Sequence, residues 1–202
     1  MESADSFLTI RTGSHTEIKI KGSKFIGQAM SCINEAEADR ILGQVRKKYH
    51  DATHHCFGYR VGSGNECKFR YSDAGEPSGT AGKPIFDQIE GRNLTDLIVI
   101  VTRYFGGTKL GTGGLAHAYS DSAALTIEKA GIIEKYITGS IPMKLTFPDY
   151  NSVERLIHQF KGNIVNSEFS DTVQLVVEMR LSLIDRFKIE AIELTSGRIE
   201  FE

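Results

Sequence analysis

The amino-acid sequence predicts an α+β protein with two domains. Residues 1–135 alternate between short aliphatic and β-branched runs, typical of strands, and segments whose apolar residues recur at helical spacing. Residues 136–202 show the same two patterns in the order β-α-β-β-α-β, which is the ferredoxin-like motif. The boundary lies in a segment over 132–144, which carries Gly139 and Pro142 and after which the pattern changes.

Composition narrows the class of protein. The chain of 202 residues has 40% hydrophobic and 25% charged residues, which is ordinary for a soluble globular protein. No apolar run approaches the roughly 18 residues of a membrane span, and the polar, acidic start of the chain is not a signal peptide. Three widely spaced cysteines (Cys32, Cys56 and Cys67) fit a reducing compartment better than a disulfide framework. We therefore expect a cytoplasmic protein with no membrane partner.

In the first domain, local signals mark the elements. The sequence Lys-Gly-Ser at 21–23 is typical of a hairpin turn between two strands. Asn34 is a favoured helix N-cap, and the basic run at 46–48 suits the other end of the same helix. Pro84 fits the first turn of a further helix. The expected elements are strands over 17–20 and 24–32, a helix over 34–49, strands over 53–61 and 68–71, a helix over 84–90, a strand over 97–101 and a helix over 115–130.

The elements of the second domain are predicted from the same kinds of local signal. Its first helix is predicted from apolar residues on one side, among them Val153, Leu156 and Ile157, and its second helix ends at Gly197. The expected elements are a strand over 140–147, a helix over 149–160, strands over 162–169 and 172–181, a helix over 183–195 and a strand over 198–202.

The segment that links the strand over 97–101 to the helix over 115–130 is rich in glycine. It holds five glycines among nine residues at 106–114, with Arg103 and Lys109 close by and no acidic residue before position 121. A strand, a basic glycine-rich loop and a helix together present backbone N–H groups and a positive helix end to an anion. The alternative is a tight turn that needs glycine only for its backbone shape. Both interpretations remain open from the residues alone.

The glycine-rich segment does not match a nucleotide-binding fingerprint well. Thr112 and Gly113 stand where the P-loop requires Lys and Ser or Thr. The run at 111–116 fits G-x-G-x-x-A, but a long loop separates it from its strand and no clear acidic partner follows. We therefore expect no dinucleotide or other cofactor.

For each of the other reactive side chains, a structural role is an alternative to a catalytic or metal-binding role. Cys56 could be a nucleophile next to a histidine, or a small residue that fills a strand core. His54 and His55 are adjacent on a strand and point to opposite faces, so they do not easily share a metal ion. Asp73 and Glu76 could form an acid pair or a magnesium site, or could close their own turn. We find no assembled catalytic set and no metal-ligand spacing, so an enzyme is the less favoured class.

Four segments of the first domain resemble the signature of the IMPACT/YigZ family. They are the run Arg-Tyr-Phe-Gly-Gly-Thr-Lys-Leu-Gly at 103–111 and the segments at 54–60, 72–77 and 79–84. The resemblance implies a first domain of the ribosomal protein S5 domain 2-like type and a ferredoxin-like second domain similar to domain V of elongation factor G. Eukaryotic relatives regulate translation through an additional N-terminal interaction domain, for which this sequence shows no counterpart before its first matching segment.

The leading hypothesis is a translation-associated binding protein that contacts RNA, the ribosome or a ribosome-associated protein. Because the net charge is −2, any RNA contact must come from a local basic patch. Tyr59 and Arg60 join this patch only if their strand neighbours the one that ends at Arg103. The residues assigned to the contact surface are Arg103, Tyr104, Gly106, Gly107, Lys109, Gly111, Gly113, Gly114, Tyr59 and Arg60.

Two further hypotheses use the same chain differently. The first is a small-molecule or nucleotide phosphate-binding enzyme that uses the glycine-rich segment together with Asp73 or Glu76 as acid, base or metal ligand. The second is a protein–protein interaction module without a small ligand.

Overall fold

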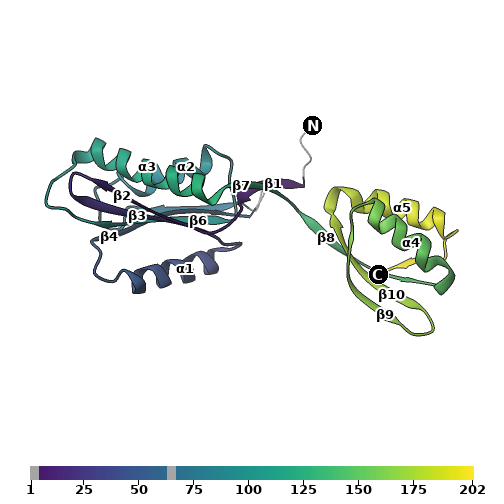
Figure 1. Cartoon of the computed structure of the whole chain (residues 1–202). Helices are drawn as coiled ribbons and strands as arrows, with labels where there is room; N and C mark the ends of the chain where they lie inside the picture. The colour runs from purple at the N-terminus through teal and green to yellow at the C-terminus, as the bar shows by residue number, and fades with distance from the viewer. Residues whose placement is uncertain (1–4, 63–66) are drawn as a thin grey trace. The chain divides into compact units, whose positions relative to one another are not determined.

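The computed structural model describes residues 5–62 and 67–202 and has an α+β fold in two compact units (Figure 1). The larger unit spans 7–134. The smaller unit contains 135–202 and, from the start of the chain, the described residues Asp5 and Ser6. Each unit has its own hydrophobic core.

The larger unit is built on a five-stranded antiparallel sheet with the strand order β2-β3-β6-β4-β5. A separate pair is formed by β1 with β7, which the sequence did not predict. The strands that lie wholly or mainly in this unit are β1 (Ser6–Ile10), β2 (Ser14–Ile20), β3 (Ser23–Ser31), β4 (His54–Val61), β5 (Lys68–Ser72), β6 (Leu97–Tyr104) and β7 (Ile132–Tyr136).

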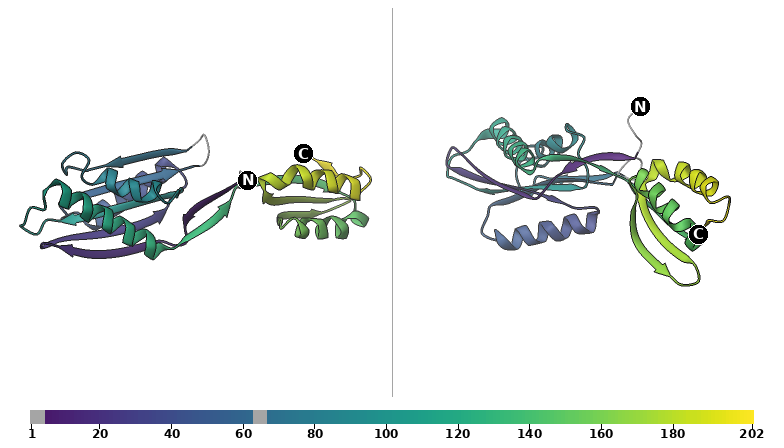
Figure 2. Two further views of the ribbon diagram at one scale, coloured as in Figure 1. Left: turned by 90° about the horizontal axis from the view of Figure 1, so that it is seen from above. Right: turned by 45° about the vertical axis from the view of Figure 1, so that its right-hand side comes forward.

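Helices cover both faces of this sheet (Figures 1 and 2). Helix α1 (Glu35–Lys48) lies on one face, and α2 (Gly82–Glu90) with α3 (Gly111–Ala130) lies on the other. The central strand β6 therefore sends Ile98 and Ile100 into the core under α1, and Val99 and Val101 into the core under α2 and α3. The strand predicted over 97–101 is therefore present and is buried on both faces.

The predicted cap of α1 is also confirmed. The Asn34 side-chain oxygen accepts a hydrogen bond of 2.9 Å from the Glu37 backbone N–H, as expected of a residue that satisfies one of the free amides of a helix start.

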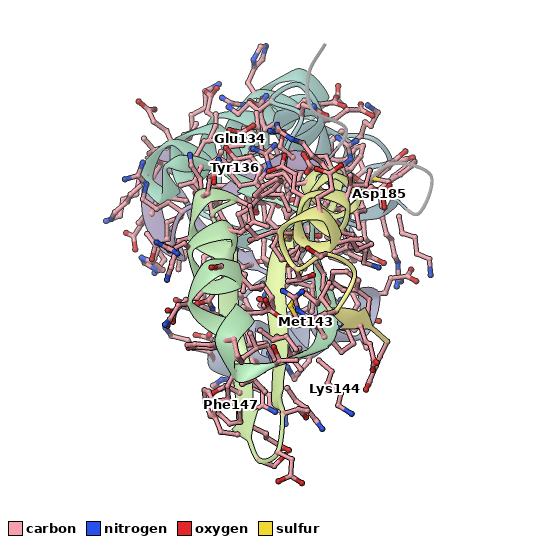
Figure 3. The ribbon with its side chains drawn as sticks, turned by 90° about the vertical axis from the view of Figure 1, so that its right-hand side faces the viewer. Glu134, Tyr136, Met143, Lys144, Phe147 and Asp185 are labelled. Carbon is pink, nitrogen blue, oxygen red and sulfur yellow. The ribbon has the colours of Figure 1, made fainter. Side chains whose placement is uncertain are left out.

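The smaller unit has the predicted β-α-β-β-α-β order and is ferredoxin-like. Its sheet order is β11-β8-β10-β9, and both helices lie on one face of the sheet (Figures 1 and 2). Figure 3 looks onto this unit and labels Met143, which lies in its core, and Lys144, the next residue on β8. The elements are β8 (Thr138–Leu145), α4 (Phe147–Gln159), β9 (Asn163–Phe169), β10 (Val173–Arg180), α5 (Ile184–Leu194) and β11 (Glu200–Phe201).

A charged contact ties the start of α4 to the segment before β11. Arg198 forms a bidentate ion pair with Asp149: Nη2 donates to Oδ1 at 2.7 Å and Nε donates to Oδ2 at 3.0 Å. Thr146 donates a further hydrogen bond of 2.8 Å to Oδ2. These hydrogen bonds favour the ionised carboxylate and lower the pKa of Asp149 from 3.8 to about 2.

This contact predicts a pH-dependent loss of stability in acid. Because the pKa of Asp149 is lower in the folded protein, its contribution is fully present above pH 3.8 and is lost as the pH falls toward about 2. We expect Asp149→Asn to lower the thermal unfolding midpoint at pH 7 and the difference from wild type to close between pH 5 and about 2. Thermal scans over this pH range test this, with Asp171→Asn in the exposed turn after β9 as the control. An equal difference at every pH would contradict the assignment.

Candidate anion-binding site at the start of helix α3

The glycine-rich segment divides between a loop and the first turn of a helix. The sequence predicted the helix from 115, but α3 already begins at Gly111, so Gly113 and Gly114 are helical. No side chain caps this end, and no acidic residue lies in its first turn. The first amides of an α-helix have no carbonyl partner within the helix. They are therefore open to an acceptor from outside.

The glycines of this segment have different roles. Gly106 packs against the turn between β2 and β3, since a Cβ atom there would lie 1.9 Å from the Gly22 carbonyl carbon. Its amide also donates to Ser23 Oγ at 3.2 Å. For Gly106 the turn interpretation therefore holds. At Gly113 a Cβ atom would meet nothing within 4 Å, and the backbone does not require glycine.

A cavity of about 360 Å³ opens beside this helix start. Its walls come from the loop after β5, the end of β6 and the first turn of α3. The lining residues are Glu76, Pro77, Arg103, Phe105, Lys109, Leu110, Gly111, Thr112 and Leu115. Lys109, Gly111 and Thr112 are also exposed to solvent, so the helix start can be reached from outside.

Arg103 is not the surface cation that the sequence predicted. It is only 5% exposed, and its Nη1 atom lies 2.6 Å from Glu76 Oε1 in a buried ion pair. Its Nη2 atom donates to Ser23 Oγ at 3.2 Å, and Nε is buried with no partner in the described part of the chain. Glu76 thus neutralises most of the charge that Arg103 would bring to a phosphate. We correct its expected role from direct contact to positioning.

Glu76 is the centre of a buried hydrogen-bond network. The Tyr119 hydroxyl of α3 donates to Glu76 Oε1 at 2.8 Å, and His54 Nε2 lies 3.9 Å from the same oxygen. Burial, with Cys56 and Glu76 as neighbours, raises the pKa of Tyr119, so it stays a neutral donor. Glu76 is therefore the counter-ion of Arg103 rather than a free acid or metal ligand.

Asp73 closes its own loop, as the structural alternative proposed. Its carboxylate accepts backbone N–H bonds from Gly79 at 2.8 Å, Ala81 at 2.9 Å and Gly82 at 2.8 Å. These three donors fix the loop between β5 and α2 and occupy the carboxylate. Among the described residues, no group of three or more histidines, cysteines or acidic residues could hold a metal ion.

Three aromatic and basic residues assigned to the contact surface lie elsewhere. Tyr104 is on the α1 side of β6, where its hydroxyl donates to Asp51 at 2.7 Å. Strands β4 and β6 are neighbours, and Tyr59 pairs with Ile98 of β6. Ile98 is five residues from Arg103, which at ~3.3 Å per residue is about 16 Å along the strand. Tyr59 is moreover buried, and Arg60 pairs with Leu97, one residue further away. The structure therefore does not bring Tyr59 and Arg60 to the glycine-rich segment.

The structure adds Phe105 and Thr112 to the site. Phe105 is 48% exposed and lines the cavity, with its ring centroid 5.5 Å from the Arg103 guanidinium carbon. The sequence assigned Tyr104 to the contact surface, but successive residues of β6 point to opposite faces, and Tyr104 lies on the other face with its hydroxyl on Asp51. Thr112 supplies a hydroxyl in the first turn of α3.

Comparison with known proteins identifies the family. The family described as "Impact N-terminal domain" matches residues 21–127, which is more than half of the chain. The chain belongs to the IMPACT family. A second match, described as "Domain of unknown function (DUF1949)", covers 143–198 of this IMPACT-family chain.

Individual relatives agree with this assignment. IMPACT family member YvyE of Bacillus subtilis is 29% identical over 98% of this chain and 90% of its own length. IMPACT family member YigZ of Escherichia coli is 29% identical over 90% of both chains. A crystal structure described only as that of a hypothetical protein superimposes with a TM-score of 0.69 at 28% identity, over 98% of this chain and 96% of that one.

In this IMPACT-family protein the four signature segments meet at the buried network. His54 comes from the segment at 54–60, Asp73 and Glu76 come from the segment at 72–77, and Arg103 comes from the segment at 103–111. The segment at 79–84 supplies the backbone amides that donate hydrogen bonds to the Asp73 carboxylate. In the described residues, no helix is both long and apolar enough to cross a membrane.

Cys56 is a core residue with a protonated thiol. Its Sγ atom donates to the Asp73 carbonyl at 2.9 Å, and burial raises its pKa to about 12. Cys32 is also buried, with its pKa raised to about 12, whereas Cys67 is half-buried.

We predict that only Cys67 reacts quickly with a thiol reagent in the folded protein. The thiolate is the reactive form, and burial suppresses it at Cys32 and Cys56. Titration with dithionitrobenzoate should give one fast equivalent in buffer and three in urea. The fast equivalent should disappear in Cys67→Ser. Its loss in Cys56→Ser instead would revive the nucleophile interpretation.

The buried ion pair predicts a large and asymmetric effect of single substitutions. Glu76→Gln leaves the Arg103 charge buried without a counter-ion and should cost about 3–5 kcal/mol of unfolding free energy. Adding Arg103→Met should recover most of this loss, because the uncompensated charge is gone. Urea unfolding measures both variants. The matched control is Asp87→Asn, which breaks the exposed Lys83–Asp87 pair and should cost below ~1 kcal/mol. A double variant less stable than Glu76→Gln would contradict this account.

Proposed function

We propose that this protein acts in translation as a binding protein that holds an RNA phosphate at the start of α3. The observation that carries the proposal is the uncapped, acid-free first turn of a 20-residue helix, exposed beside Lys109 and opening onto a cavity. Helix N-termini favour phosphate through their free amides and their positive dipole end. The translation role follows from the family resemblance and rests on that analogy alone.

A few groups provide the hydrogen bonds, the positive charge and the stacking surface of the proposed site. The amides of the first turn and the Thr112 hydroxyl can donate hydrogen bonds to phosphate oxygens, and Lys109 supplies the positive charge. Phe105 offers an exposed ring on which a base can stack, a contact that contributes ~1–3 kcal/mol per base. Because Arg103 is neutralised by Glu76, it supports this arrangement by holding the end of β6.

The sheet face of the smaller unit that its helices leave uncovered is a less suitable surface for RNA. The face of its sheet opposite α4 and α5 carries a row formed by Glu168, Gln174, Lys144 and Glu200, with partners paired across neighbouring strands. Acidic residues outnumber the single cation in this row, and they repel phosphate. This row of the smaller sheet is therefore a poor contact for RNA.

A second candidate function uses the same cavity for a small phosphorylated molecule. The volume of about 360 Å³ falls within the range of small-ligand sites. Asp73 and Glu76 have structural partners, so this ligand would be bound rather than turned over by them.

We predict that Gly113→Asp weakens RNA binding without loss of stability. A carboxylate in the first turn interacts well with the helix dipole but repels a phosphate at the same place. We expect a roughly tenfold weaker Kd for dye-labelled single-stranded RNA, about 1.4 kcal/mol. Gly113→Ala is the matched control, because it adds a Cβ in open space without charge and should keep wild-type affinity. Fluorescence anisotropy at two salt concentrations gives the Kd values.

Salt dependence gives an independent readout. Lys109→Ala should lower the slope of log K against log salt by about 0.7, the value for one phosphate contact to a single strand. RNA binding that is absent at low salt, or unchanged in Gly113→Asp, would reject the proposal. A thermal shift with nucleotides but no RNA binding, abolished by Gly113→Asp, would favour the small-molecule alternative.

A further inference from the structure

The edge of the larger sheet at β5 is open for pairing. β5 is the last strand in the order β2-β3-β6-β4-β5, so it has a strand neighbour on one side only. Its five residues pair with β4 in an unbroken register without a bulge, and it contains no proline. Bulges, prolines and covering loops are the common devices that protect an edge strand from a further strand.

One face of β5 carries an ordered pair of exposed aromatic rings. Phe69 is 58% exposed and Tyr71 is 41% exposed. Both stack on Phe86 of α2, with centroid distances of 4.9 Å for Phe69 and 5.6 Å for Tyr71. The rings are therefore held in place from below while their outer surfaces face solvent. Pre-ordered rings lose little conformational entropy when a partner covers them.

The opposite face of β5 carries cations. Lys68 and Arg70 alternate with the two aromatic residues and are well exposed. Arg70 contacts Asp39 at the long distance of 3.8 Å, and a guanidinium has five N–H donors. It can therefore bind a second carboxylate placed directly across from it on an added strand.

We propose that β5 is a docking edge for an extended peptide of a partner protein, with apolar and acidic residues in alternation. The peptide adds a sixth strand through backbone hydrogen bonds. Its apolar side chains cover Phe69 and Tyr71, and its acidic side chains lie beside Lys68 and Arg70. This surface is separate from the start of α3, so it does not depend on the proposed RNA contact.

Two other occupants fit this edge less well. The same strand of a second copy, paired about Phe69 or Arg70, would place cations opposite cations, which is destabilising. RNA needs cations that are free to replace its counterions, but Lys68, Arg70 and Lys83 each have an acidic neighbour. An added strand also forms backbone hydrogen bonds along the open edge, so its binding does not depend on the cations alone.

The test uses a dye-labelled peptide with the sequence Glu-Val-Glu-Phe-Glu-Val-Glu, blocked at both ends, and the full-length protein. We expect saturable binding by fluorescence anisotropy. Arg70→Glu should weaken it about two- to fivefold and should favour the matching Lys-Val-Lys-Phe-Lys-Val-Lys peptide instead. Lys19→Glu makes the same charge change on β2, the other edge strand, and should alter neither affinity. Phe69→Ser should weaken both peptides.

Controls on the peptide and on the alternatives complete the experiment. Replacing the central Phe of the peptide by Pro removes a backbone N–H and should abolish binding. No binding, equal binding of the Pro peptide, or no effect of Arg70→Glu in protein with an unchanged circular dichroism spectrum would each overturn the proposal. Self-association lost in Arg70→Glu, or single-stranded RNA binding lost in Phe69→Ser without peptide binding, would assign the edge to those occupants instead.

Discussion

The buried Glu76–Arg103 ion pair organises the end of the central strand. It joins the loop after β5 to β6, and Glu76 also receives the Tyr119 hydroxyl from α3. One carboxylate thereby links three parts of the chain that are distant in sequence. A buried charge without its partner is costly, so each member of this network constrains the others. The geometry of the adjacent cavity follows from this constraint.

The pairing also decides where positive potential is available. A free arginine at this position would attract an anion directly, but Glu76 lies 2.6 Å from it and cancels most of its field. The remaining positive elements are the amides of the first turn of α3 and Lys109. Recognition by amides requires close approach and defined geometry, and it is less sensitive to bulk charge than a lysine patch. The proposed anion site is therefore compatible with the net charge of −2.

Local signals in the sequence predicted the elements but not their long-range partners. The buried β6, the Asn34 cap and the β-α-β-β-α-β order follow from periodicity and capping, and the structure has all three. The β1–β7 pair joins the two ends of the larger unit and has no local signal. Arg103 looked like a surface cation because its partner Glu76 is 27 residues away. The early start of α3 was missed because glycine is unfavourable in helices, yet Gly111, Gly113 and Gly114 all lie in its first turn.

That unfavourable start is itself informative about the site. A Ser or Asp N-cap would satisfy one free amide and stabilise the helix by about 1 kcal/mol, whereas α3 starts after Leu110 with glycines in its first turn. Gly113 faces open space, so packing does not explain why a side chain is absent there. An acidic or bulky side chain at Gly113 would repel or screen an anion that meets the amides, whereas the single Cβ of alanine would not. Gly111 has a φ of 74°, so its backbone conformation favours glycine, whereas at Gly113 the lower helix stability fits the proposed binding position, as in other sites that trade stability for function.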